Sequence, residues 1–440
     1  MKTVLLATNH KFWLANRGAR IRIAHLYRFL LEAGFKVPVF FPGTLDEADR
    51  QHIECMRPRP DLVPAVDTNN AARRPETGRH APGTPLRRLL RVPRSVAALL
   101  ARIRQRRGPA PRAADPSGDA EQTAPAHGPP RLCDFTVPAW QQAFRAACLE
   151  VLPHVVLVEG IGLCHLLQAL PETERARPST VIDTHDVMHK RYRRFRIHGE
   201  PHWIQIDRDE EADALRPFDV VLAIQNRDAA TFREMLPNKR ILTVSHAHPI
   251  PPAEPYPERA PLTLCYVASH GHHNRRALAQ FLESVWPKLN KRLGRNLAFA
   301  VYGQICEVLD PNALPDGVRL QGKVEKLEPV YRNADIVINP VFFGGGLKIK
   351  NVEALCSARP LLTTRIGAEG IEHGADSAFL VADTDDQMCE QLVRLATQPQ
   401  LRRKLAAEAR RFALENFSEQ AAYGPLRRLL EEELPLPGAG

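Results

Sequence analysis

The sequence predicts an α/β protein made of two doubly wound, Rossmann-like domains. Short apolar or β-branched runs alternate with helix-patterned stretches over residues 1–250 and again over 262–412, which is typical of parallel sheets covered by helices. Between them lies the proline-dense stretch HPIPPAEPYPERAP, at 248–261, which favours a stiff linker. With 440 residues, the chain is long enough for two domains with large cores.

The first domain is expected to open with a strand, a helix and a second strand. Residues 2–7 (KTVLLA) have a buried-strand pattern, too short for the apolar core of a signal peptide, and Gly34 follows a helix-patterned stretch at 16–31. Residues 56–131 then interrupt the pattern, since Pro, Arg, Ala and Gly dominate and no sustained strand is predicted. The other predicted strands are 35–41, 155–158, 180–183, 219–224 and 241–244, and the helices are 139–149, 163–170, 205–215 and 227–235.

The second domain repeats this architecture without repeating the sequence. Strands are expected at 262–268, 297–302 and 379–381, and helices at 275–292 and 392–412. An amphipathic helix at 418–433, within a terminal segment 413–440, completes the pattern. We expect this helix to cross back to the first domain, as the family resemblance described below implies.

The most informative segment is 335–371, DIVINPVFFGGGLKIKNVEALCSARPLLTTRIGAEGI. It predicts a buried strand, a glycine loop, a short helix, a second strand and another glycine loop. The glycines at 344–346 remove every side chain from the turn before the helix, so backbone N–H groups and the helix dipole can meet an anion. Lys348 and Lys350 add positive charge, and the Glu353 carboxylate could accept hydrogen bonds from a diol. These features indicate a site for a phosphorylated nucleoside.

This segment resembles the donor site of GT-B glycosyltransferases, specifically the large retaining glycosyltransferase family 4 group. The match runs through Gly344, Gly346, Lys348, Lys350, Glu353, Ala354, Pro360 and Thr364. The resemblance implies a GT-B fold and transfer of a sugar, with retention, from a nucleotide-sugar donor to a glycan or lipid-linked acceptor in surface glycan synthesis. It implies no cofactor and no metal.

The resemblance also implies roles for individual residues. The catalytic set would be His185, Lys350 and Glu353, with Lys348 and Lys350 on the diphosphate, Glu353 on the ribose and His185 near the transferred sugar. Donor contacts are expected from Ser269, Asn274, Arg275, Gly344, Gly345, Gly346, Leu347 and Lys348, and acceptor contacts from Gly18 and Glu159. His185 and Glu159 follow predicted strands, where ligands of open α/β sheets bind, although helix capping or a surface position would also suit them. Asp186 is expected to cap the next helix.

Two positions depart from the family pattern. Gly345 lies eight residues before Glu353, at a position where many members carry a first glutamate. Arg359 stands where a glycine is usual. These departures suggest a non-catalytic GT-B partner subunit as one alternative. Another GT-B enzyme, such as a sugar-nucleotide epimerase or a phosphorylase, is a second alternative that stays open.

Metal binding and membrane or nucleic-acid contacts rest on weaker patterns. Asp383-Thr384-Asp385 resembles a metal-binding D-x-D motif and His270, His272 and His273 are close in sequence, but neither has a complete ligand set.

Eight scattered cysteines indicate reduced thiols and a cytoplasmic protein. The +10 net charge equals the ten arginines between residues 76 and 115. Residues 79–112 could therefore lie on an anionic membrane, as a peripheral contact, or form a solvated insertion. No nucleic-acid partner is expected, because stacking aromatics are missing there.

Overall fold

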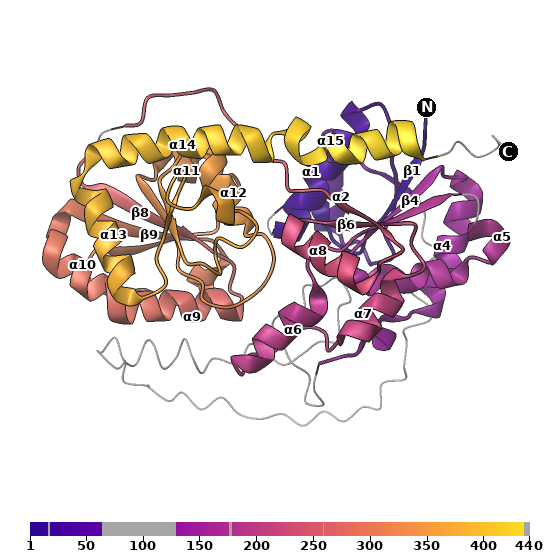
Figure 1. Cartoon of the computed structure of the whole chain (residues 1–440), viewed down its shortest axis with the longest axis horizontal. Coiled ribbons are helices and arrows are strands. Elements are labelled where there is room, and N and C mark those ends of the chain that lie inside the picture. The colour runs from indigo at the N-terminus through magenta and orange to yellow at the C-terminus, as the bar shows by residue number, and fades with distance from the viewer. Residues whose placement is uncertain (16–17, 64–128, 176–177, 258, 435–440) are drawn as a thin grey trace.

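The computed structural model describes residues 1–15, 18–63, 129–175, 178–257 and 259–434. The arginine-rich segment 79–112 and most of the predicted insertion at 56–131 lie outside these residues. Two α/β domains lie side by side, joined by the chain near residue 250 and by a long helical segment that runs along both (Figure 1).

Both domains contain an all-parallel sheet. The first has the strand order β3-β2-β1-β4-β5-β6-β7, and the second has the order β10-β9-β8-β11-β12-β13. In each sheet the first strand along the chain lies beside the second and the fourth, so each has one topological switch point. The first-sheet strands are Val4–Ala7, Pro38–Phe40, Asp61–Val63, Val155–Glu159, Ser179–Asp183, Val220–Ala223 and Arg240–Thr243. The second-sheet strands are Leu262–Val267, Leu297–Tyr302, Val318–Gly322, Ile336–Asn339, Leu361–Thr363 and Leu380–Val381.

The predicted fold class is confirmed, and two strands were not anticipated. Strand β3 (Asp61–Val63) pairs with β2 inside the segment where no strand was expected, and β10 (Val318–Gly322) forms the far edge of the second sheet. Both are edge strands with exposed positions. Such strands lack the continuous apolar run that identifies a central parallel strand.

Alternate residues of the central strands pack on opposite faces. In β1, Val4 and Leu6 belong to one core cluster, and Leu5 and Ala7 belong to another. All four side chains have no exposed surface. Helices therefore cover both faces of the sheet, which accounts for the uninterrupted apolar strand sequence.

Most predicted helices are present, and the helices at 47–55, 172–175 and 328–333 were not anticipated. The helices are α1 Gly18–Glu32, α2 Glu47–Cys55, α4 Pro138–Val151, α5 Glu172–Arg175, α6 Met188–Ile197, α7 Arg208–Leu215, α8 Asn226–Met235, α9 His272–Gln280, α10 Trp286–Leu293, α11 Glu328–Asn333, α12 Ile349–Cys356, α13 Asp385–Thr397, α14 Pro399–Phe417 and α15 Glu419–Arg428.

Three predicted helices have other forms. The 392–412 stretch is divided at Gln398 between α13 and α14. The 163–170 stretch is a 3₁₀ helix, Ile161–Ala169, and the 275–292 stretch divides into α9, a π-helical turn Phe281–Val285 and α10. Pro287 explains the division, because its ring nitrogen cannot donate a helical hydrogen bond and its ring crowds the preceding turn.

The C-terminal helices connect the two domains. Helix α14 packs on the second domain through Ala409 and Phe412, whereas α15 packs on the first through Tyr423 and Leu426. Figure 1 shows α14 and α15 running end to end over both domains. None of the helices in the described residues is long and apolar enough to span a membrane.

Candidate active site

A cavity of about 660 Å³ opens between the two domains. The carboxyl ends of β1 and β4, the switch point of the first sheet, lie on one side of it, and the loops after β8 and β11, the switch point of the second, lie on the other. Of the predicted residues, the cavity is lined by Gly18, Glu159, His185, Ser269, Asn274, Gly344, Gly345, Leu347, Lys348, Lys350 and Glu353. Gly346 and Arg275 are not among its lining residues.

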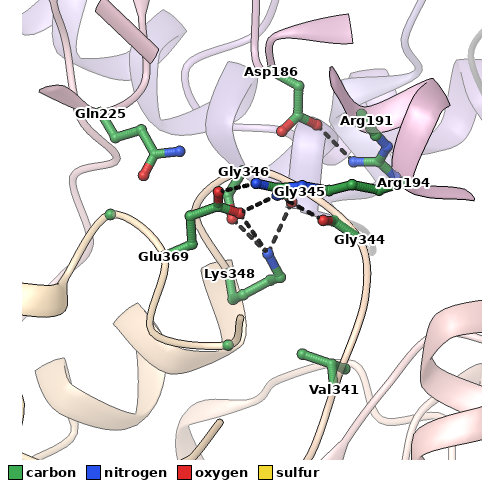
Figure 2. A network of polar contacts seen from close by, with 12 residues as sticks. Asp186, Arg191, Arg194, Gln225, Val341, Gly344, Gly345, Gly346, Lys348 and Glu369 are labelled. Carbon is green, nitrogen blue, oxygen red and sulfur yellow. Dashed lines mark hydrogen bonds and ion pairs between the residues drawn. The ribbon is translucent and has the colours of Figure 1, made fainter. Parts of the chain in front are cut away.

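The glycine loop after β11 is shaped by two left-handed residues. Gly344 has φ +117° and Gly346 has φ +70°, values that favour glycine. Lys348 occupies the position before α12, and its Nζ donates to the carbonyl oxygens of Gly345 at 2.9 Å and Gly346 at 2.6 Å (Figure 2). Burial lowers the pKa of Lys348 to about 8, although Glu369 partly opposes this shift. The Lys348 ammonium is thus hydrogen-bonded within the glycine loop. To contact a phosphate, it would have to extend away from these carbonyl oxygens.

Lys350 and Glu353 lie on the inward face of α12. Lys350 Nζ donates to Asn274 Oδ1 at 2.8 Å and sits 4.8 Å from the centre of the Tyr266 ring. Tyr331 donates its hydroxyl proton to Glu353 Oε2 at 2.7 Å. Burial lowers the pKa of Lys350 to about 7 and raises that of Glu353 to about 7. Both groups therefore titrate near neutrality and respond to the charge of a ligand.

The loop after β8 supports this wall of the cavity. Asn274 Nδ2 donates to Ser269 Oγ at 3.1 Å, and Asn274 Oδ1 accepts from Lys350. The Asn274 side-chain amide therefore links Ser269 to Lys350. Arg275 points elsewhere, with its Nη2 3.0 Å from the His272 ring. The structure thus brings Ser269 and Asn274 to the cavity but leaves Arg275 beside it.

The opposite wall carries a buried charged cluster. His185 has a left-handed backbone, φ +62°, and its Nε2 lies 2.7 Å from Glu159 Oε2. Neither residue caps a helix in this arrangement. Burial lowers the pKa of His185, but the Asp183 and Glu159 carboxylates outweigh it and hold the pKa above its usual value. Burial and Asp183 raise the pKa of Glu159.

Arg22 completes this cluster from helix α1. Its Nε donates to Asp183 Oδ2 at 2.8 Å, and both side chains are fully buried. Oxygen and nitrogen atoms of Glu159, Asp183 and His185 lie within 4.8 Å of one another, a spacing that a metal ion could use. Because Arg22 already neutralises Asp183 and His185 already pairs with Glu159, the cluster offers a divalent cation little uncompensated negative charge.

An interdomain bridge of Arg194, Glu369 and Gly344 was missed by the sequence analysis. Arg194, on α6, donates through Nη1 and Nη2 to Glu369 at 2.7 and 2.8 Å, and through Nη1 to the Gly344 carbonyl oxygen at 2.9 Å (Figure 2). The first domain therefore holds the glycine loop of the second. The partners are 150 and 175 residues apart, so no local spacing could reveal the contact.

Asp186 also faces the glycine loop, and its predicted capping role was wrong. Glu211 caps α6 instead, accepting from the backbone N–H groups of Met188 at 2.7 Å and His189 at 2.8 Å. Asp186 Oδ2 accepts from Arg191 at 2.6 Å (Figure 2). A β-carbon added to Gly346 would lie 1.9 Å from Asp186 Oδ1. A carboxylate from the first domain thus lies against the bare loop.

The two weaker metal motifs have other partners in the structure. Thr384 caps α13, and Asp383 accepts from the backbone N–H of Arg365 at 2.8 Å. His272 Nδ1 lies 2.8 Å from Glu200 Oε2, a carboxylate that sequence spacing did not place near the histidines. These contacts account for the motifs through helix capping and ion pairing.

Comparisons with known proteins agree with this architecture. Residues 261–398 match the family described as Glycosyl transferases group 1. An uncharacterized 44.6 kDa protein in the cps region of Klebsiella pneumoniae is 24% identical over 102 residues, which cover 23% of this chain and 26% of that protein. The match thus spans about a quarter of the curated relative.

Solved structures resemble the whole fold at low sequence identity. Sucrose-phosphate synthase from Thermosynechococcus elongatus is 15% identical with a TM-score of 0.65, over 98% of this chain and 99% of that one. A mutant form of S. aureus TarM, in complex with fondaparinux, α-GlcNAc-glycerol and UDP, is 10% identical with a TM-score of 0.66, over 98% and 100%. HepE of Anabaena in complex with UDP and glucose is 11% identical with a TM-score of 0.61, over 98% and 100%. The chain has the GT-B fold, and its second domain is similar to the group 1 glycosyltransferase family over residues 261–398.

Proposed function

We propose that the protein transfers a sugar from a nucleoside-diphosphate sugar to an acceptor hydroxyl, with retention, in surface glycan or polysaccharide synthesis. The observation that carries the proposal is one cavity with two chemically different walls. Lys348, Lys350 and Glu353 lie beside a bare glycine loop on one wall, and His185 with Glu159 lies on the other. The cps-region origin of the Klebsiella relative supports the glycan context.

The donor wall suits a nucleoside diphosphate. Lys350 and Lys348 would balance the diphosphate charge, and the anion would in turn raise both lysine pKa values and keep them protonated. Ionised Glu353 would accept hydrogen bonds from the ribose hydroxyls while Tyr331 holds its second oxygen in place. The left-handed loop at Gly344 and Gly346 would let the sugar phosphate approach the backbone closely.

The reaction needs one bond exchange and one proton transfer. The bond from the anomeric carbon to the phosphate oxygen breaks, and a bond to the acceptor oxygen forms on the same face. The acceptor proton passes to the departing phosphate oxygen, so no protein group needs to form a covalent bond. Protonated His185, oriented by Glu159 at 2.7 Å, would hydrogen-bond the sugar near this centre and stabilise negative charge.

Gly345 leaves the loop without the glutamate that many relatives carry. A β-carbon there would lie 3.4 Å from Arg191 and 3.7 Å from Asp186 Oδ1, so the ion pair of the opposite domain lies in van der Waals range of this position. We propose that Asp186 is a sugar-positioning residue, which would compensate for Gly345. A non-catalytic partner subunit is the second candidate function, and it is favoured by the same glycine.

A donor panel tests the proposal. The full chain is incubated with UDP-, GDP- and dTDP-sugars, and release of the nucleoside diphosphate is measured with and without simple acceptors. Glu353→Gln and Lys350→Ala should each remove most turnover, whereas the exposed Glu328→Gln and Lys326→Ala should retain it. Turnover of no donor would support the partner subunit, and wild-type turnover in both site variants would refute the assigned site.

The membrane contact is a separate proposal. Residues 79–112 would hold the protein at an anionic cytoplasmic surface where lipid-linked acceptors are available. Flotation with anionic liposomes should then depend on this segment, and equal flotation after its deletion would contradict the proposal.

A further inference from the structure

Three histidines outside the active site converge on one point. His25 lies in α1, and His246 and His248 lie in the segment that leaves β7 for the second domain. The centroid of the His25 ring is 5.4 Å from that of His246 and 5.5 Å from that of His248, and the latter two are 6.1 Å apart. One ring nitrogen of each lies within 4.8 Å of the other two.

The hydrogen bonds leave lone pairs available in this cluster. His25 Nδ1 lies 2.9 Å from the carbonyl oxygen of Ala247, so Nδ1 carries the proton and Nε2 keeps its lone pair. His246 is completely buried, and neither of its ring nitrogens has a partner among the described residues; the buried Nδ1 of His248 has none either. Leaving such polar atoms unsatisfied is costly.

The charge state favours metal ligation rather than protonation. Burial lowers the pKa of all three imidazoles, and that of His248 falls to about 3. Neutral imidazole is the form that binds metals. The neighbouring Arg22 is already paired with Asp183 at 2.8 Å, which limits the repulsion that its charge would exert on a bound cation.

We propose that His25, His246 and His248 form a site for a divalent transition-metal ion of the Zn²⁺ class. Three neutral nitrogen donors suit Zn²⁺, Co²⁺ or Ni²⁺ and leave a position for water. The bond from His25 Nδ1 to a backbone carbonyl is the arrangement that orients metal-binding histidines.

The position of these histidines indicates a structural role for the ion. His248 donates its backbone N–H to the Phe417 carbonyl oxygen at 3.0 Å, at the break between α14 and α15. A bound ion would therefore connect α1, the interdomain segment and the crossing helices. This inference is independent of the proposed transfer reaction, because these histidines do not line the 660 Å³ cavity.

The test uses the full chain, purified without a polyhistidine tag and treated with EDTA. Co²⁺ alone is titrated, and we expect visible d–d absorption that saturates at one equivalent and is displaced by Zn²⁺. Zn²⁺ should also raise the unfolding temperature of the wild type. Absence of both effects would overturn the proposal without reference to any variant.

Variants then locate the ion. His25→Gln and the half-buried His248→Gln should weaken Co²⁺ affinity at least about 10-fold and abolish the Zn²⁺-dependent rise in unfolding temperature. His272→Gln, which removes a histidine paired with Glu200, is the matched control and should bind as the wild type does. Circular dichroism verifies that each variant is folded. If the His25 variant does not fold, the result for the His248 variant tests the proposal. Equal affinity in wild type and His248→Gln would place the ion elsewhere and refute the assignment.

Discussion

Affinity for a nucleoside diphosphate should fall steeply as pH rises from 7 to 9. A lysine whose pKa is lowered by the fold loses its charge as pH rises through that lowered value, about 7 for Lys350 and about 8 for Lys348. If the bound diphosphate requires both lysines to be charged, then at high pH both must take up a proton on binding. The ligand itself changes little over this range, because the second pKa of a phosphate is about 6.

The magnitude follows from these two values. Between pH 7 and pH 9 the protonated fraction falls about 50-fold for Lys350 and about 10-fold for Lys348, since each pKa unit beyond the titration point corresponds to about 1.4 kcal/mol. The combined loss of affinity is therefore about 500-fold. Isothermal titration of UDP in buffers of different ionisation enthalpy measures both the affinity and the uptake of more than one proton at pH 9.

Two controls separate the lysines from other effects. Arginine remains charged over the whole range, so Lys350→Arg should reduce the pH effect from about 500-fold to about 10-fold. Uridine, which has no phosphates, should show no comparable loss. A change in wild-type UDP affinity of less than about threefold, without proton uptake, would refute the assignment of these lysines to the diphosphate.

Three further substitutions test the geometry around the cavity. Gly346→Ala should abolish most donor binding, because its β-carbon would lie 1.9 Å from a carboxylate oxygen. The control is Gly199→Ala, because Gly199 has a similar φ of +67° and nothing lies within 4 Å of the added β-carbon. This control should lower the free energy of urea unfolding by only about 1–2 kcal/mol. Tyr331→Phe should lower the unfolding free energy by about 1.5–3 kcal/mol by leaving the buried Glu353 oxygen without its donor; unchanged stability would contradict that role. Arg194→Gln should raise the donor KM about 5- to 30-fold, equivalent to 1–2 kcal/mol of lost loop order, and an unaltered KM would show that the interdomain bridge does not order the loop.

The fold could be predicted because its determinants are local. Central strands such as β1 and β4 are continuous apolar runs, and the glycine loop with Lys350 and Glu353 lies within one short segment, so periodicity and motif were sufficient. The edge strand β3 was not predicted, because a strand with solvent on one side lacks a continuous apolar run.

The remainder of the site could not be predicted because it depends on tertiary contacts. Asp186 follows a strand and precedes a helix, the ordinary place for a cap, yet the Glu211 carboxylate reaches that helix end from the next helix. Arg194 belongs to a basic helix that looks like a solvated surface in sequence, and only the packing of the domains brings it to Glu369. Pairings across 22 to 175 residues leave no periodic signal.

The crossing of α15 has a consequence for synthesis of the chain. Tyr423, Leu426 and Leu429 belong to the same core cluster as Val4 and Leu6, so the first domain lacks part of its core until the end of the second has been made. At about 5–20 residues per second, the ribosome needs roughly 10–35 s to travel from β7 to α15. During that interval the face of α1 around Phe29, which the Tyr423 ring covers at 4.9 Å in the finished fold, is open to chaperones or to aggregation. The order of translation therefore makes folding of this first domain a late event.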